Sequence, residues 1–325
     1  MYYSEVISFS IGGLIFLLQT FILDQATFCS PVSRYTRRIS SVVLVILFLW
    51  LPSVHAEPLR VTVVLSEEGG VYQAFSDLLR VKLPVAKFAL NTESIDQTSV
   101  TADVYVAVGM KAASALASRT APVLSVLVPK SGYDRLLHGQ HHSAIYLDQP
   151  MDRQVALLLD ALPSIRHVGV LYSTPPHDLP HLRHLLAQRN VQLYEQAIED
   201  EGSLNDALES ILNESEVLFV LPDSGVYNPG TIRNILLATY RKQIPLIGIS
   251  QTYVKAGALF AAYSTPGQIA VQTADVLRHF SLSGKLPASQ YPKDFEVSVN
   301  KQVARSLDIQ IKDEAKLRSE VREIP

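Results

Sequence analysis

From Leu59 onward, short apolar runs alternate with longer amphipathic segments, and this alternation limits the possible folds more than any other feature of the sequence. Short apolar runs predict strands, and apolar residues recurring every three or four positions predict helices. Strands that alternate with helices are typical of α/β proteins. The predicted strands are Arg60–Leu65, Ala86–Leu90, Val104–Val108, Val123–Val128, His167–Tyr172, Val191–Ala197, Val217–Leu221, Leu246–Ile249 and Ala258–Ala262. The predicted helices are Tyr72–Lys82, Lys111–Ser118, Met151–Ala161, Leu179–Gln188, Leu204–Asn213, Thr231–Arg241 and Gln268–Phe280.

The strands fall into two sets, separated by a segment rich in Gly and His between Gly132 and Gln149. Several strands are almost continuously apolar, as expected when helices cover both faces of a parallel sheet. We therefore predict two doubly wound, Rossmann-like lobes. The first takes residues 57–145 and a returning helix, 266–288; the second takes residues 146–265 and the C-terminal segment 289–325. The chain is expected to cross between the lobes near Ser143–Gln149, Tyr263–Gly267 and Leu286–Lys293.

The N-terminal 56 residues have the composition of a targeting segment. Arg34, Arg37 and Arg38 precede a short apolar run and the small-residue site Val54-His55-Ala56, a pattern typical of a cleaved signal peptide. Glu57, not Cys, follows the site, so we expect a periplasmic product without a lipid anchor. The uncharged stretch from Val6 to Leu23 leaves two alternatives open: a membrane helix that tethers the protein, or a true start downstream of Met1.

Composition excludes several classes of partner and site. The net charge is −3, and the basic residues are spread along the chain, so no basic stripe for nucleic acid is present. The only cysteine, Cys29, precedes the predicted mature protein, so neither a disulfide nor a cysteine-based metal site is expected there.

Residues just after the strands are the candidate ligand contacts, because open parallel sheets bind ligands beyond the carboxyl ends of their strands. These residues carry hydroxyl groups, glycine backbone and a few charges, which suit a small polar molecule. Each of them could instead cap the following helix or face solvent. The candidates are Ser66, Glu67, Gly109, Met110, Lys130, Ser173, Asp223, Ser224, Ser250 and Gln251.

Four stretches resemble the family of ABC transporter substrate-binding proteins whose members bind tryptophan and related solutes on the type I periplasmic-binding fold. They are Val104–Gly109 with Lys111–Ala113, Gly169–Ser173, Pro245–Ser250 with Val254–Leu259, and Phe295–Leu307. The resemblance implies a monomeric solute-binding protein, without a cofactor, that closes on its solute and delivers it to an ABC permease in the inner membrane. A partner that reports to a membrane sensor is an alternative with the same fold.

The sequence departs from the family pattern at two places that border the family's cleft. Pro129-Lys130-Ser131 stands where an Asp-Pro pair is usual, and Tyr263–Gly267 replaces a Tyr-rich acidic turn. The resemblance therefore does not imply amino-acid specificity.

Two further classes of function compete with solute binding. An enzyme is disfavoured because the chain has no G-x-S-x-G elbow, phosphate loop, G-x-G-x-x-G after its first strand, or H-E-x-x-H motif. A metal-binding protein is suggested by two groups of histidines, which surface positions explain equally well. The two groups are His177, His181 and His184, and His138, His141 and His142.

Overall fold

A computed structural model describes residues 57–95, 101–136, 139–199 and 202–322. The predicted signal peptide, the uncharged stretch before it, and Cys29 all lie outside these residues. Glu57–Pro325 form one compact unit. Both sheets and every hydrophobic cluster of the described chain are built within this unit, so it contains complete cores of its own and can fold separately.

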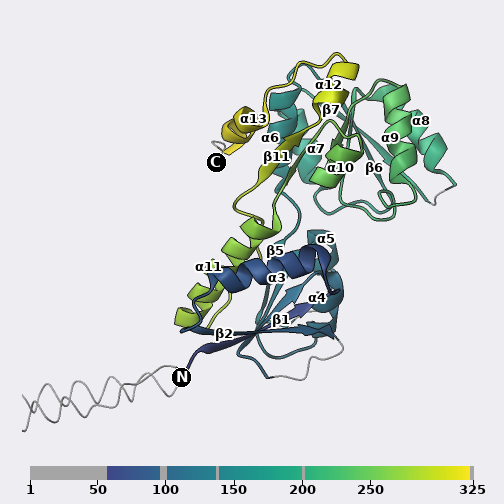
Figure 1. Ribbon diagram of the computed structural model, residues 1–325. Helices are drawn as coiled ribbons and strands as arrows, with labels where there is room; N and C mark the ends of the chain where they lie inside the picture. Colours follow the sequence, from purple (N-terminus) through teal and green to yellow (C-terminus); the bar gives the residue numbers. More distant parts are fainter. Residues whose placement is uncertain (1–56, 96–100, 137–138, 200–201, 323–325) are drawn as a thin grey trace, which may run out of the picture. The chain divides into compact units, whose positions relative to one another are not determined.

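The first sheet has five parallel strands in the order β2-β1-β3-β4-β5. Apolar side chains pack on both of its faces: α3 and α11 cover one, and α4 and α5 cover the other (Figure 1). The strands are β1 (Leu59–Leu65), β2 (Phe88–Ser94), β3 (Val104–Val108), β4 (Val123–Val128) and β5 (His142–Tyr146). The helices are α3 (Gly70–Lys82), α4 (Met110–Leu116), α5 (Lys130–Tyr133) and α11 (Pro266–Ser283).

The second sheet has six strands in the order β11-β10-β9-β8-β6-β7, and only β11 is antiparallel. One hydrophobic cluster packs α6, α7, α12 and α13 on it, and another packs α8, α9 and α10. The strands are β6 (His167–Tyr172), β7 (Gln192–Ala197), β8 (Val217–Phe219), β9 (Leu246–Gly248), β10 (Phe260–Tyr263) and β11 (Glu296–Val299). The helices are α6 (Met151–Ala161), α7 (Leu179–Ala187), α8 (Leu204–Glu214), α9 (Ile232–Arg241), α10 (Gln251–Ala256), α12 (Lys301–Ser306) and α13 (Glu314–Arg322).

These two doubly wound sheets confirm the predicted fold class. The helix α11 illustrates how local sequence sets an element's ends. Thr265 and Gln268 form a reciprocal capping box at its start, Pro266 occupies its first turn, and Gly284 ends it with a left-handed φ of +66°. Its inner face packs against the first sheet through Ile269, Leu277 and other apolar side chains.

The segment between Gly132 and Gln149 corrects one expectation. We expected only a separator there, but His142–Tyr146 form β5, the fifth strand of the first sheet. This strand lies at the edge of the sheet and begins with His142 and Ser143, so its apolar run is too short to stand out in the sequence. The edge strand β2 likewise extends through polar residues to Ser94, beyond the predicted end at Leu90.

Candidate functional site

A cavity of about 810 Å³ lies beyond the carboxyl ends of strands from both sheets. Its lining is rich in hydroxyl, carboxylate and tyrosine side chains, with proline and a few aliphatic residues between them. The lining residues are Pro129, Ser131, Asp134, Arg135, Leu147, Asp148, Gln149, Gln154, Ser173, Thr174, Pro175, Pro176, His177, Pro222, Asp223, Ser224, Gly225, Tyr227, Ile249, Ser250, Tyr253, Ala262, Tyr263 and Ser264.

Four of the sequence-predicted site residues lie in this lining: Ser173, Asp223, Ser224 and Ser250. The Asp223 carboxylate joins the loops after β6 and β8. It accepts hydrogen bonds from the Ser173 backbone N at 2.6 Å, from Ser173 Oγ at 2.8 Å and from the Gly225 N at 2.8 Å. Such charge-assisted bonds fix both loops at the edge of the cavity.

Ser250 has a structural role in addition to its place in the lining. Its Oγ accepts a hydrogen bond from the Tyr253 N at 3.4 Å and caps α10. Gln251, the first residue of that helix, is exposed and is not part of the lining. The structure therefore brings Ser250, but not Gln251, to the cavity.

The predicted contacts after β1 and β3 gather around the start of α4, outside the lining. Ser66 Oγ accepts a hydrogen bond from the Ala112 N at 3.0 Å, and Glu67 forms an exposed ion pair with Lys111 at 2.6 Å. Gly109 has a φ of +85°, and a Cβ there would lie 2.7 Å from Ser66 Oγ. Met110 begins the helix beside them.

Lys130 lies next to the cavity and contacts two of its carboxylates. Its backbone N donates to Asp148 Oδ2, and its Nζ pairs with Asp134 Oδ2 at 2.5 Å. Burial lowers the pKa of the Lys130 ammonium, but the hydrogen bond and charge of Asp134 outweigh it, so this pKa lies above its ordinary value. Burial raises the pKa of the Asp148 carboxyl, and the hydrogen bond from Lys130 only partly offsets that shift. Next to the first-sheet wall, the Lys130 ammonium thus pairs with Asp134, while its backbone N binds Asp148.

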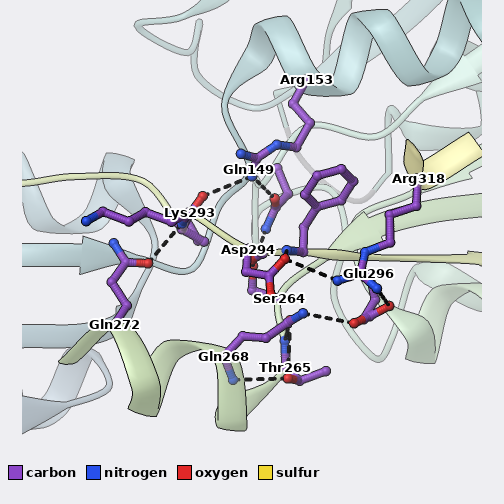
Figure 2. Close-up of polar contacts among 12 residues, drawn as sticks. Gln149, Arg153, Ser264, Thr265, Gln268, Gln272, Lys293, Asp294, Glu296 and Arg318 are labelled. Atoms are coloured by element: carbon purple, nitrogen blue, oxygen red, sulfur yellow. Dashed lines mark hydrogen bonds and ion pairs between the residues drawn. The ribbon is translucent and has the colours of Figure 1, made fainter. Parts of the chain in front are cut away.

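The chain passes between the sheets at three places, after β5, after β10 and before β11, and hydrogen bonds join these crossing segments (Figure 2). Gln149 Nε2 donates to Ser264 Oγ at 2.9 Å, and Ser264 Oγ donates to the Asp294 carbonyl at 2.6 Å. The Arg153 guanidinium donates to Gln149 Oε1 at 2.7 Å and to the Pro292 carbonyl at 3.0 Å. Gln149 and Ser264 also line the cavity, so this network forms part of its wall.

Sequence reasoning missed several lining residues, and the cause can be identified. Asp148 and Gln149 directly follow β5, the strand that was not predicted. Tyr263 and Ser264 lie at the end of β10, where the same rule of strand ends would have found them. Asp134 lies on the loop after α5, too far beyond β4 for that rule.

The histidines proposed as a metal site are held by different partners. His181 Nε2 lies 2.8 Å from Asp152 Oδ2, His177 Nδ1 lies 3.2 Å from Asp178 Oδ1, and His184 contacts Gln188. Of the second group, His142 Nε2 lies 2.8 Å from the Arg119 carbonyl, and His138 is outside the described residues. Within the described ranges, no three His, Cys, Asp or Glu side chains are grouped so that they could hold a metal ion.

The described helices include none that is both long and apolar enough to span a membrane.

Comparison with protein families decides the class of this protein. The model of the family described as ABC transporter substrate binding protein matches residues 99–321, which include β3 to β11 and the whole cavity lining. The chain belongs to this family. No curated protein matches it at the level of sequence.

Solved structures share the fold of this ABC transporter substrate-binding protein. A ligand-free, open substrate binding protein with adhesive properties from Clostridium difficile has a TM-score of 0.60 at 15% identity, covering 78% of this chain and 96% of that chain. The ABC domain in complex with L-Trp from Streptococcus pneumonia has a TM-score of 0.59 at 14% identity, covering 79% and 98%. A conserved domain protein from Vibrio cholerae has a TM-score of 0.56 at 22% identity, covering 81% and 98%. These likenesses confirm the type I periplasmic-binding fold.

Proposed function

We propose that this substrate-binding protein holds a small polar solute in the cavity and presents it to the permease of an ABC importer. The observation that carries the proposal is that one cavity is lined from both sheets, at the carboxyl ends where open α/β sheets bind ligands. Hydroxyl groups and charges of both signs line it, among them Ser173, Asp223 and Arg135. Such groups orient a small polar molecule by hydrogen bonds.

The crossing segments support a hinge. The first two are short, and all three lie between separately packed sheets, so a few backbone rotations in these segments would change the distance between the two walls of the cavity. A solute contacted from both walls favours the closed form, because only that form completes its contacts. The permease then recognises the closed protein.

The proposed location is the periplasm, with cleavage after Ala56 and Glu57 as the mature N-terminus. The signal-like pattern before Ala56 supports this proposal, as does the compact unit that begins at Glu57. If Val6–Leu23 is retained as a membrane helix, the same unit is tethered instead of free.

A thermal-shift screen of small polar solutes tests the binding function. A solute present at a hundredfold excess over its Kd stabilises the folded state by about 2.7 kcal/mol, which raises the melting temperature by several degrees. Asp223→Asn should reduce that rise, whereas the matched carboxylate variant Glu67→Gln, outside the lining, should leave it intact. A stabilising solute that is equally effective on both variants would place the binding site elsewhere.

A further inference from the structure

The three most exposed large apolar side chains of the described residues come from one end of the first sheet. They are Leu282 at 89% exposed, Val85 at 84% and Val81 at 79%; the next, Tyr240 on α9, is 53% exposed. Single exposed apolar residues are ordinary, but gathering the most exposed ones at one place is a property of interaction surfaces.

Hydrogen bonds bring the segments that carry these side chains to the same end of the first sheet. The Arg278 guanidinium of α11 donates to the Lys82 carbonyl at the end of α3, at 2.7 Å. Leu282 lies one turn after Arg278 on the same face of α11, and Val81 precedes Lys82. Val85 lies in the loop between α3 and β2, where the Lys87 carbonyl accepts a hydrogen bond from the Leu59 N at 2.9 Å. Figure 1 shows the ends of α3 and α11 meeting near the start of the described chain.

Basic residues lie close in the chain to each of the three apolar residues. Val81 lies between Arg80 and Lys82, Lys87 comes two residues after Val85, and Lys285 comes three residues after Leu282. Near these three residues in the chain there are fewer carboxylates than cations. One of the carboxylates, Asp275, is paired with Arg278 at 2.5 Å. We call this set the basal surface: apolar Val81, Val85 and Leu282; basic Arg80, Lys82, Lys87, Arg278 and Lys285; acidic Glu57, Asp77 and Asp275.

The basal surface lies at the amino ends of the first-sheet strands, whereas the cavity lies beyond their carboxyl ends. It adjoins the start of β1, just after Glu57, the residue at which the chain leaves its N-terminal segment. That segment contains the uncharged stretch Val6–Leu23 and the apolar run Ser41–Leu51. The chain therefore enters the folded unit beside its most exposed apolar side chains.

We propose that the basal surface binds the anionic face of a phospholipid bilayer. Exposed aliphatic side chains enter the boundary between headgroups and acyl chains, and the surrounding cations contact anionic headgroups. A second copy of the chain is a poorer occupant, because a two-fold dimer would bring together two copies of a surface that carries more cations than carboxylates. Contact through this edge leaves the carboxyl ends of the first-sheet strands free for solute.

Sedimentation with phospholipid vesicles tests the proposal, using residues 57–325 so that the apolar N-terminal segment does not contribute. The probe is a vesicle of equal parts phosphatidylglycerol and phosphatidylcholine, at low salt. Lys82→Gln, Lys87→Gln and Lys285→Gln should each weaken the apparent partition coefficient about fivefold. Val81→Ser, Val85→Ser and Leu282→Ser together should weaken it at least about tenfold. All these side chains are exposed, so the variants should melt at the temperature of the unaltered protein.

The matched controls come from α9, α10 and α12. Leu237→Ser with Tyr240→Ser removes exposed apolar side chains there, and Lys255→Gln with Lys301→Gln removes exposed cations. Both controls should sediment like the unaltered protein, and Lys→Arg at the three basal lysines should retain binding. The proposal is wrong if the unaltered protein does not bind the anionic vesicles, if phosphatidylcholine alone binds it as well, or if the controls lose as much binding as the basal variants. A concentration-dependent dimer that the basal variants abolish, without vesicle binding, would assign the surface to a second copy.

Discussion

Ser264 Oγ accepts a hydrogen bond from Gln149 Nε2 at 2.9 Å and uses its own hydrogen to bond the Asp294 carbonyl at 2.6 Å. One hydroxyl group thus joins all three crossing segments, although Gln149 and Ser264 are 115 residues apart in the chain. Both side chains are buried. Both also line the cavity, so one wall of the cavity and the crossing segments share these side chains.

Ser264→Ala should lower the free energy of unfolding by about 1–3 kcal/mol, because it leaves a buried amide and a carbonyl without their partner. Urea unfolding measures this loss. Ser306→Ala is the matched control: that hydroxyl also donates to a backbone carbonyl, of Val303 at 2.9 Å, but on an exposed turn of α12. A loss no larger than that of the control would show that water replaces the Ser264 contacts at no cost.

Gly109→Ala should destabilise the protein by more than the same change at Gly284. Both glycines have a left-handed φ, +85° and +66°, so alanine is strained at either position. At Gly109 the added Cβ would also lie 2.7 Å from Ser66 Oγ and 2.8 Å from the Tyr72 ring, whereas nothing lies within 4 Å at Gly284. We expect about 1 kcal/mol at Gly284 and at least about 2 kcal/mol at Gly109. Equal losses in urea unfolding would mean that Ser66 and Tyr72 move aside freely.

The alternation of apolar strands and amphipathic helices was sufficient to predict two doubly wound sheets. It worked because central parallel strands such as β3, Val104–Val108, are buried on both faces and must be apolar throughout. It failed at the far end of β2, because this edge strand is covered less completely and tolerates polar residues. It failed at β5 for another reason: four of its five residues are buried, but His142 and Ser143 leave an apolar run of only three residues in the strand. Short helices such as α10 are also missed, since six residues contain too little of the helical period.

A site residue could be predicted from the sequence only where the strand before it could be predicted. Ser173, Asp223, Ser224 and Ser250 follow strands of the second sheet and reach the cavity. The rule of strand ends does not distinguish a solute contact from a helix cap. It therefore predicts Ser66 as a contact, although its hydroxyl accepts a hydrogen bond from the start of α4. Asp148 required knowledge of β5, which only tertiary packing supplies.

Ser66→Ala and Ser173→Ala should separate these two roles. Ser66→Ala should lower the free energy of unfolding by about 1 kcal/mol, the usual value of a helix cap, and leave the solute-induced rise in melting temperature unchanged. Ser173→Ala should reduce that rise, because its hydroxyl positions the Asp223 carboxylate at the cavity wall. Thermal melts of each variant with and without a stabilising solute give both quantities. A smaller solute effect in Ser66→Ala would show that the start of α4 also contacts the solute.

Asp148 should make stability fall as pH rises through its raised pKa. Burial raises the pKa of this carboxyl in the folded protein above its unfolded value, so the folded state holds the proton up to a higher pH. Between the two pKa values the folded state binds more protons, and its stability decreases as pH increases. Asp148→Asn removes this effect, so the variant should gain stability relative to the unaltered protein as pH rises above the ordinary pKa of an aspartate carboxyl.

Asp103 provides a comparison of opposite sign. The hydrogen bond from Arg60 lowers the pKa of its carboxyl, so its contribution to stability is present above the unfolded pKa and is lost as pH falls through the folded pKa. Relative to Asp103→Asn, the unaltered protein should therefore lose stability on acidification. Urea unfolding measures both differences, above the ordinary carboxyl pKa for Asp148 and below it for Asp103. Slopes of the same sign for the two variants would contradict the assignment of Asp148.

Solute binding should reduce the radius of gyration of the protein, as measured by small-angle scattering. The cavity has one wall after β4 and β5, with Lys130 and Asp134 beside each other, and another after β6 and β8, with Ser173 and Asp223. A solute that bonds to both walls has more contacts when they approach, and it can shift the population toward the closed form only by its difference in affinity for the two forms. The decrease in the radius of gyration should follow the fraction of protein that has solute bound. Asp223→Asn should therefore need more solute for the same decrease. A solute that does not change the melting temperature should leave the radius unchanged. If a solute of proven affinity leaves scattering unchanged, and the permease binds the protein equally well without it, the hinge is not the mechanism.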